Sequence, residues 1–129
     1  MGKDRILIID DEEDFLMIAK LNLESTGKYE VQTSTSAKDI ISMVHDFKPK
    51  VILLDILMPG VGGIDACEML NNDPIGSKTP IIVISALSKI KDKLMAYKKG
   101  ISDYLVKPVG KDELIAKIEK TLKYKDGES

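Results

Sequence analysis

Four short runs of apolar, largely β-branched residues each end directly in a polar residue, and this pattern constrains the fold more than any other feature. The runs, with the polar residues that end them, are Arg5–Ile9 with Asp10 and Asp11, Val51–Leu54 with Asp55, Ile81–Ile84 with Ser85, and Tyr104–Val106 with Lys107. Such runs are typical of strands buried on both faces. Because the carboxyl ends of parallel strands share one edge of a sheet, we expect these polar side chains to meet there.

Segments with helical spacing separate these runs, so expected strands and helices alternate along the chain. We expect strands at residues 5–10, 29–34, 51–54, 81–85 and 103–106. We expect helices at 12–26, 36–48 and 64–70, a fourth helix that carries Ile90, Leu94 and Tyr97 before Gly100, and a fifth around Leu114–Leu122. The strand at 29–34 alternates apolar and polar residues, which favours a sheet edge. Ser36 with Asp39 resembles a helix capping box. Right-handed crossovers then predict an α/β fold, a doubly wound five-stranded parallel sheet with five helices.

The size of the chain, 129 residues, predicts a single domain over 1–129, with a core at about 3–122 and a polar tail at 123–129. That tail could equally begin a linker to a further domain. A net charge of −2 argues against a nucleic-acid or membrane partner. The single cysteine, Cys67, excludes an internal disulfide and fits a reduced, cytoplasmic setting. No apolar run approaches the length of a membrane span, and residues 1–4 lack a signal-peptide core.

The carboxylates predicted at the sheet edge require a positive partner. Asp10, Asp11 and Asp55 would repel one another as bare anions, whereas Mg²⁺ binds carboxylate and carbonyl oxygens and keeps several waters. We therefore predict a Mg²⁺ site, with Mn²⁺ as an alternative, formed by these three side chains and the backbone carbonyl of Leu57. The competing interpretation is that Asp10 and Asp11 only cap the following helix.

The same edge contains the groups that phosphoryl transfer needs. Asp55 is the candidate nucleophile, because carboxylates form aspartyl-phosphate intermediates. Lys107 and Ser85 would then neutralise and hydrogen-bond the phosphoryl oxygens. In isolation, Lys107 could be an exposed strand-end lysine and Ser85 a helix cap or turn residue. The bond between Lys107 and Pro108 is a candidate cis peptide.

In this order and at these separations, the motifs resemble the receiver domain of two-component response regulators, the CheY-like family. The resemblance runs from about Lys3 to Leu122 and rests on four segments: Ile9–Glu12, Leu54–Pro59 with Gly63, Ser85–Ala86 and Asp103–Pro108. It implies the flavodoxin-like strand order 2-1-3-4-5 that CheY has. It also implies that Asp55 accepts a phosphoryl group from a sensor histidine kinase or a histidine phosphotransfer protein, in a Mg²⁺-dependent reaction.

The resemblance also implies a role for the other site residues. Asp10 and Asp11 would be the acidic pair, Ser85 the switch hydroxyl, Lys107 the charge partner, and Tyr104 the aromatic residue that turns inward on activation. A rim residue packed on the fourth helix is the alternative for Tyr104. The face formed by the fourth helix, fifth strand and fifth helix would control a protein target or an output domain, and a homodimer through that face is a further expectation. The domain would be a signalling module rather than an enzyme, although Mg²⁺-dependent self-phosphorylation and autodephosphorylation are expected.

Two rival functions meet specific obstacles in the sequence. A magnesium-dependent phosphatase with an aspartyl nucleophile usually has a second acid two residues after the nucleophile, where this chain has Leu57. A flavodoxin-like cofactor binder needs donors after the first strand, where Asp10–Glu13 would repel phosphate. Leu57 and Leu87 also flank the route of attacking water in the resembled family, so we expect a long-lived acyl phosphate. We expect His45 to be structural or exposed, because no acid or amide is positioned to form a kinase-like site.

Overall fold

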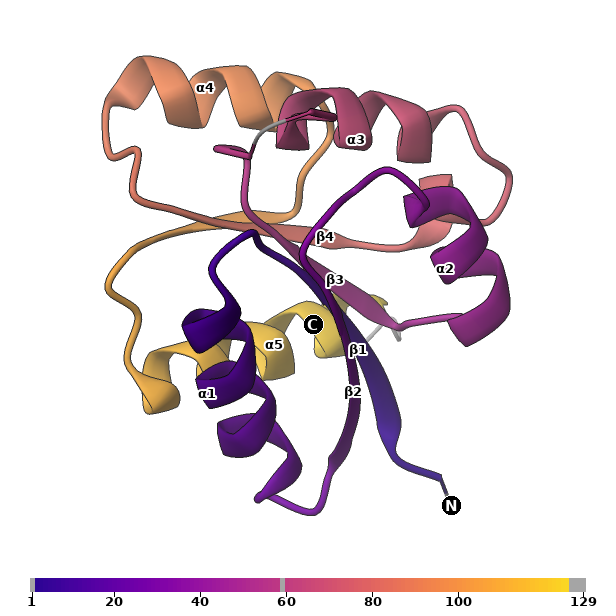
Figure 1. Cartoon of the computed structure of the whole chain (residues 1–129), viewed down its shortest axis with the longest axis vertical. Helices are drawn as coiled ribbons and strands as arrows, with labels where there is room; N and C mark the ends of the chain where they lie inside the picture. The colour runs from indigo at the N-terminus through magenta and orange to yellow at the C-terminus, as the bar shows by residue number, and fades with distance from the viewer. Residues whose placement is uncertain (1, 59, 126–129) are drawn as a thin grey trace.

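The computed structural model describes residues 2–58 and 60–125, which form a single parallel sheet between two layers of helices (Figure 1). The strands are β1 (Asp4–Ile9), β2 (Tyr29–Ser34), β3 (Val51–Leu54), β4 (Ile81–Ser85) and β5 (Asp103–Val106). The helices are α1 (Glu13–Glu24), α2 (Ile40–Phe47), α3 (Gly63–Asn71), α4 (Ile90–Lys98) and α5 (Lys111–Lys125), with a short 3₁₀ turn at Gly76–Lys78. The strand order is β2-β1-β3-β4-β5, which confirms the expected fold class and places β2 at an edge.

The alternation of side chains along β1 creates two separate halves of the core. Ile6 and Ile8 face the layer of α1 and α5, whereas Leu7 and Ile9 face the layer of α2, α3 and α4. All four side chains are essentially inaccessible to solvent. The part of a strand that is covered on both faces has to be apolar, which explains why residues 6–9 are all apolar, whereas Asp4 and Arg5 lie at the more accessible start of β1.

Two details of the helices differ from the expectation. The capping box at Ser36 is wrong: α2 begins at Ile40 without a side-chain cap, and the Ser36 hydroxyl instead accepts a hydrogen bond from the backbone N–H of Lys38. The last helix continues to Lys125, so the first part of the expected polar tail is helical. Residues 126–129 of that tail, like Pro59 in the motif after Asp55, lie outside the described residues.

The apolar residues that predicted α4 do not face the core. Ile90, Leu94 and Tyr97 recur at helical spacing, yet all three are exposed, and Ala96 is the buried residue of this helix. The periodicity therefore identified a helix correctly but marks an apolar strip on the surface. Among the described helices, none combines the length and the apolar character that crossing a membrane requires.

The start of α3 lies directly against the chain that follows Asp55. A Cβ atom added to Gly63 would lie 2.3 Å from the Ile56 Cα and 2.5 Å from the Asp55 carbonyl oxygen. Both neighbours are backbone atoms, which cannot rotate away. Gly63 is therefore required for the close approach that sets the position of Asp55, whereas a Cβ atom on Gly62 would meet nothing within 4 Å.

We expect Gly63→Ala to lower the free energy of unfolding by about 1–3 kcal/mol, because the added methyl group overpacks a backbone contact. The matched control is Gly62→Ala, where φ is −70° and the space is open, so that its effect should stay below about 1 kcal/mol. Urea unfolding of both variants measures the difference. Equal effects of the two substitutions would contradict the packing argument.

Candidate functional site

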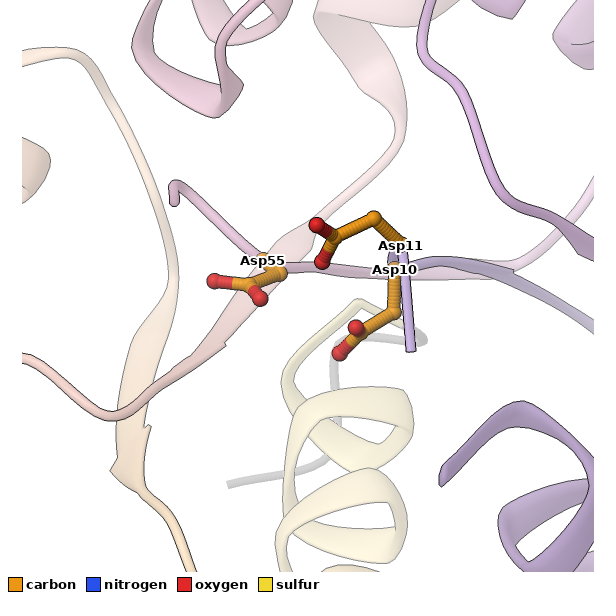
Figure 2. A group of neighbouring side chains, drawn as sticks. All are labelled: Asp10, Asp11 and Asp55. Carbon is orange, nitrogen blue, oxygen red and sulfur yellow. The ribbon is translucent and has the colours of Figure 1, made fainter. Parts of the chain in front are cut away.

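Asp10, Asp11 and Asp55 meet at the carboxyl edge of the sheet, as the sequence predicts. β1 and β3 are neighbours with Ile9 opposite Leu54, so that the residues directly after them, Asp10 and Asp55, emerge side by side. One carboxylate oxygen from each of the three aspartates lies within 4.8 Å of the others. Figure 2 shows the side chains of Asp10 and Asp11 extending toward the side on which Asp55 lies. The group has the oxygen donors and the spacing to hold a divalent cation.

The three carboxylates differ in their access to solvent. Asp10 is 1% exposed and Asp55 is 4% exposed, whereas Asp11 is exposed. Backbone N–H groups hold the two buried side chains: that of Glu12 donates to Asp10 Oδ1 at 2.9 Å, and that of Leu57 donates to Asp55 Oδ1 at 3.0 Å. Buried carboxylates need such donors, because an unpaired buried charge is costly. Two carboxylates of the cluster are therefore buried and held in place, and the third is accessible to solvent.

Lys107 supplies the positive charge of the site. Its Nζ atom donates to Asp10 Oδ2 at 2.7 Å and to Glu12 Oε1 at 2.6 Å, and it lies 3.4 Å from Asp55 Oδ2. It also lies 4.6 Å from the centre of the Phe15 ring, within the range of a cation–π contact. The alternative of an exposed strand-end lysine is therefore wrong, because this side chain is only 13% exposed.

The peptide bond between Lys107 and Pro108 is cis. Immediately before it, the backbone N–H of Lys107 donates to the Ser85 carbonyl at 2.9 Å. This hydrogen bond continues the pairing of β5 with β4 by one residue and brings Lys107 to the same edge as the aspartates.

Burial and charge act on Asp10 and Lys107 in opposite ways. Burial raises the pKa of the Asp10 carboxyl, and hydrogen bonds from Lys107 and from the Glu12 backbone only partly offset this effect. Burial on its own would lower the pKa of the Lys107 ammonium, but hydrogen bonds to Asp10 and Glu12 and the charge of Asp55 outweigh it and raise that pKa. The ammonium therefore stays charged at neutral pH, whereas burial makes the ionised form of Asp10 less favourable.

Ser85 and Tyr104 both contact the backbone of Leu87, in the loop between β4 and α4. The fully buried Ser85 hydroxyl accepts a hydrogen bond from the Leu87 N–H at 3.2 Å, and the Tyr104 hydroxyl donates to the Leu87 carbonyl at 2.7 Å. The alternative of a helix cap does not hold for Ser85, because α4 begins only at Ile90, whereas the alternative of a turn residue agrees with its hydrogen bond to the N–H group two residues on. The side chain of Tyr104 is buried rather than on the rim.

Sequence reasoning missed Glu12 as a partner of Lys107, because the two residues are 95 positions apart and an exposed glutamate carries no distinctive pattern. The expectation of a structural or exposed His45 is confirmed, although the sequence did not identify its partner, Asp73. The Nε2 atom of His45 lies 2.8 Å from Asp73 Oδ1, and Asp73 also accepts hydrogen bonds from the N–H groups of Ile75 and Gly76. This pair joins α2 to the loop after α3, in keeping with a structural histidine.

The comparisons with known proteins agree on the family. A model described as the response regulator receiver domain matches residues 6–119. The DNA-binding dual master transcriptional regulator RpaA of Synechocystis sp. is 33% identical over 95% of this chain and 50% of its own length. The response regulator PleD of Caulobacter vibrioides is 35% identical over 94% of this chain and 26% of its own length. This chain therefore spans half or less of these relatives.

Solved structures of receiver domains have a similar fold. A response regulator receiver domain protein (CheY-like) from Methanospirillum hungatei superposes with a TM-score of 0.89 at 25% identity, over 99% of this chain and 100% of that one.

We expect Asp10→Asn to raise the free energy of unfolding of the metal-free protein at neutral pH by about 1 kcal/mol or more, because it removes a buried charge that also lies beside Asp55. The pKa of Asp10 is raised in the folded state. The folded state therefore favours protonated Asp10. This contribution to stability is fully present below the ordinary aspartate pKa and is lost as the pH rises through the pKa of Asp10 in the folded state.

The advantage of Asp10→Asn should accordingly shrink toward zero at acid pH, where Asp10 is protonated in both states. Urea unfolding at a series of pH values in a chelating buffer tests this, with Asp14→Asn on the exposed face of α1 as the control. A variant less stable than the wild type at neutral pH would contradict the argument.

Proposed function

This chain belongs to the response regulator receiver domain family, and from that premise we propose that Asp55 accepts a phosphoryl group from the phosphohistidine of a sensor histidine kinase or of a phosphotransfer protein. The observation that carries the proposal is the convergence of Asp10, Asp11 and Lys107 on Asp55. Carboxylates and one ammonium from three separate strand ends provide the positioning and the charge neutralisation that phosphoryl transfer requires.

The residues present fit a Mg²⁺ ion. The three carboxylate oxygens lie within 4.8 Å of one another, and two of the carboxylates are buried with more negative charge around them than Lys107 can balance. Asp10, Asp11, Asp55 and the backbone carbonyl of Leu57 would hold the ion, and Mn²⁺ would suit the same ligands. When bound, Mg²⁺ would supply charge neutralisation to the phosphoryl oxygens.

Asp55, Lys107 and Ser85 would each have a different role in the transfer. An Asp55 carboxylate oxygen forms the new bond to phosphorus, the bond from phosphorus to the donor imidazole nitrogen breaks, and the imidazole leaves with its electron pair. Asp55 Oδ1 is held by the Leu57 N–H, whereas Oδ2 faces Lys107. The Lys107 ammonium would pair with one phosphoryl oxygen, and the Ser85 hydroxyl would donate to another.

We further propose that phosphorylation biases an existing two-state equilibrium of the face formed by α4, β5 and α5. Ser85 is the residue of the site that touches the loop before α4, and Tyr104 holds the same loop through the Leu87 carbonyl. Movement of the Ser85 hydroxyl toward a phosphoryl group would alter both contacts with Leu87. The signal would then reach α4 through that loop.

The proposed output face presents apolar side chains that the core does not use. Ile90, Leu94 and Tyr97 of α4 are exposed, and an apolar strip of this kind often marks a protein interface. The occupant would be a protein target, an output domain or a second copy of the chain. Because the chain covers half or less of its curated relatives, an output domain outside this sequence is part of the proposal.

Incubation with acetyl phosphate and Mg²⁺ should add the mass of one phosphoryl group to the intact protein, and hydroxylamine should remove it, because acyl phosphates react with that nucleophile. We expect no adduct with Asp55→Asn, and none with the wild type when a chelator removes the metal. Intact-mass spectrometry measures each case. An adduct of the same yield in Asp55→Asn would rule out Asp55 as the acceptor.

We expect the acyl phosphate to be comparatively long-lived, because neither Leu57 nor Leu87 can hydrogen-bond an attacking water. Leu57→Asn or Leu87→Glu should therefore speed hydrolysis. One net hydrogen bond is worth about 0.5–1.5 kcal/mol, which corresponds to about a two- to twelvefold change in rate. Loss of phosphate over time, with Leu57→Met as an apolar control, measures the effect. Unchanged rates in both polar variants would contradict the role of these positions.

A further inference from the structure

We propose that Glu12 is a positioning residue for Lys107: it holds the ammonium on the α1 side of the aspartates while Asp55 is unmodified, and releases it to the phosphoryl group afterwards. This inference rests on the proposed function of Asp55 and deepens it. It concerns the position of one charge before the reaction, which the contacts of the described residues define.

Among the described residues, Lys107 is the one hydrogen-bond partner of the Glu12 carboxylate. Glu12 is the residue before α1, yet its carboxylate makes no capping hydrogen bond to that helix. Its backbone N–H is fixed by Asp10 Oδ1, and its side chain turns back across the site to meet Lys107 Nζ at 2.6 Å. The Glu12 carboxylate thus lies near the cluster of Asp10, Asp11 and Asp55, with which it shares Lys107, but is not one of its members.

An exposed ion pair alone would contribute little, since such pairs are typically worth less than about 1 kcal/mol. The pair between Glu12 and Lys107 differs because its two partners have very different environments. The Glu12 side chain is 63% exposed, but that of Lys107 is only 13% exposed. The same ammonium contacts the buried Asp10 and Asp55. When the ammonium lies closer to Glu12, it neutralises less of the negative charge of Asp10 and Asp55. More of that charge is then available to bind a metal ion.

Phe15 supports the same position. Its ring lies 4.6 Å from Lys107 Nζ, and Phe15 and Glu12 both line a depression of about 490 Å³ beside Lys107 on the α1 side. Glu12 and the aromatic face thus give the ammonium favourable contacts away from the aspartates. A metal ion that binds to the aspartates then competes less with Lys107 than it would if Asp10 and Asp55 were its only partners.

The charge balance indicates when the exchange takes place. Among the described residues, Lys107 is the one ammonium that pairs with the carboxylates of Asp10, Glu12 and Asp55, and Asp11 adds a fourth carboxylate to the site. After transfer, the phosphoryl oxygens are a more concentrated negative charge than the solvated Glu12 carboxylate, and charge-assisted hydrogen bonds to them are strong. Lys107 would therefore leave Glu12 for a phosphoryl oxygen, and Glu12 would return to solvent.

Mg²⁺ affinity of the unphosphorylated protein, measured by isothermal titration calorimetry, tests this role. We expect Glu12→Gln to weaken Mg²⁺ binding about two- to fivefold more than Glu13→Gln does. Glu13 is the matched control, because it removes the same charge from the next residue, and no hydrogen bond or ion pair of its side chain occurs among the described residues. In a Lys107→Met background the two substitutions should have equal effects, since the cycle isolates the coupling between Glu12 and Lys107.

The outcomes separate this inference from the function on which it rests. If the wild-type protein binds no Mg²⁺ and gains no phosphoryl group, the proposed function fails. If the wild type does both but Glu12→Gln and Glu13→Gln weaken Mg²⁺ binding equally, the positioning role of Glu12 is overturned and only its overall charge matters. An excess effect of Glu12→Gln that persists in the Lys107→Met background would also overturn it. Thermal unfolding followed by circular dichroism verifies that each variant is folded.

Discussion

The excess of negative charge at one edge of the sheet is the constraint on which the rest of the site depends. Asp10 and Asp55 are buried next to each other, with Asp11 beside them and Lys107 as the neighbouring cation. A pair of backbone N–H groups and one ammonium only partly compensate for this arrangement, because burial, and to a smaller extent the charge of Asp55, raise the pKa of Asp10. This imbalance favours the binding of a divalent cation. Burying the carboxylates destabilises the folded protein, and a cation bound between them would offset that cost.

The sheet can hold this strained edge because its interior is apolar on both faces. Every residue of β3 is inaccessible to solvent, and Ile6–Ile9 of β1 are equally buried between the two helical layers. Asp10 and Asp55 extend the two central strands by one residue each, so that the packing of two whole strands fixes their positions. Gly63 adds the last restraint, since only a residue without a side chain lets α3 approach the backbone after Asp55.

The sequence predicted the structure closely where a sequence pattern could arise in only one structural setting. The expected strands at 29–34, 51–54, 81–85 and 103–106 match the observed bounds, because buried parallel strands must be apolar and their ends are marked by polar residues. The meeting of the three aspartates follows from the same rule. Features with two competing causes were predicted less well: the spacing of Ile90, Leu94 and Tyr97 fits a core-facing helix and a binding surface equally. The contacts of Glu12 with Lys107 and of His45 with Asp73 depend on side-chain placement across the fold, for which a single sequence carries no local signal.

The short loop between β4 and α4 is where the two parts of the proposed switch meet. The N–H of Leu87 donates a hydrogen bond to Ser85 in the site, and the carbonyl of Leu87 accepts one from Tyr104 in β5. Tyr104 belongs to β5, whose first residue, Asp103, accepts hydrogen bonds from Tyr97 of α4 and Lys117 of α5. Hydrogen bonds thus connect all three elements of the proposed output face with the loop that Ser85 holds. A displacement of Ser85 by a fraction of an ångström would change bonded contacts rather than diffuse packing, which is why a single phosphoryl group could bias the whole face.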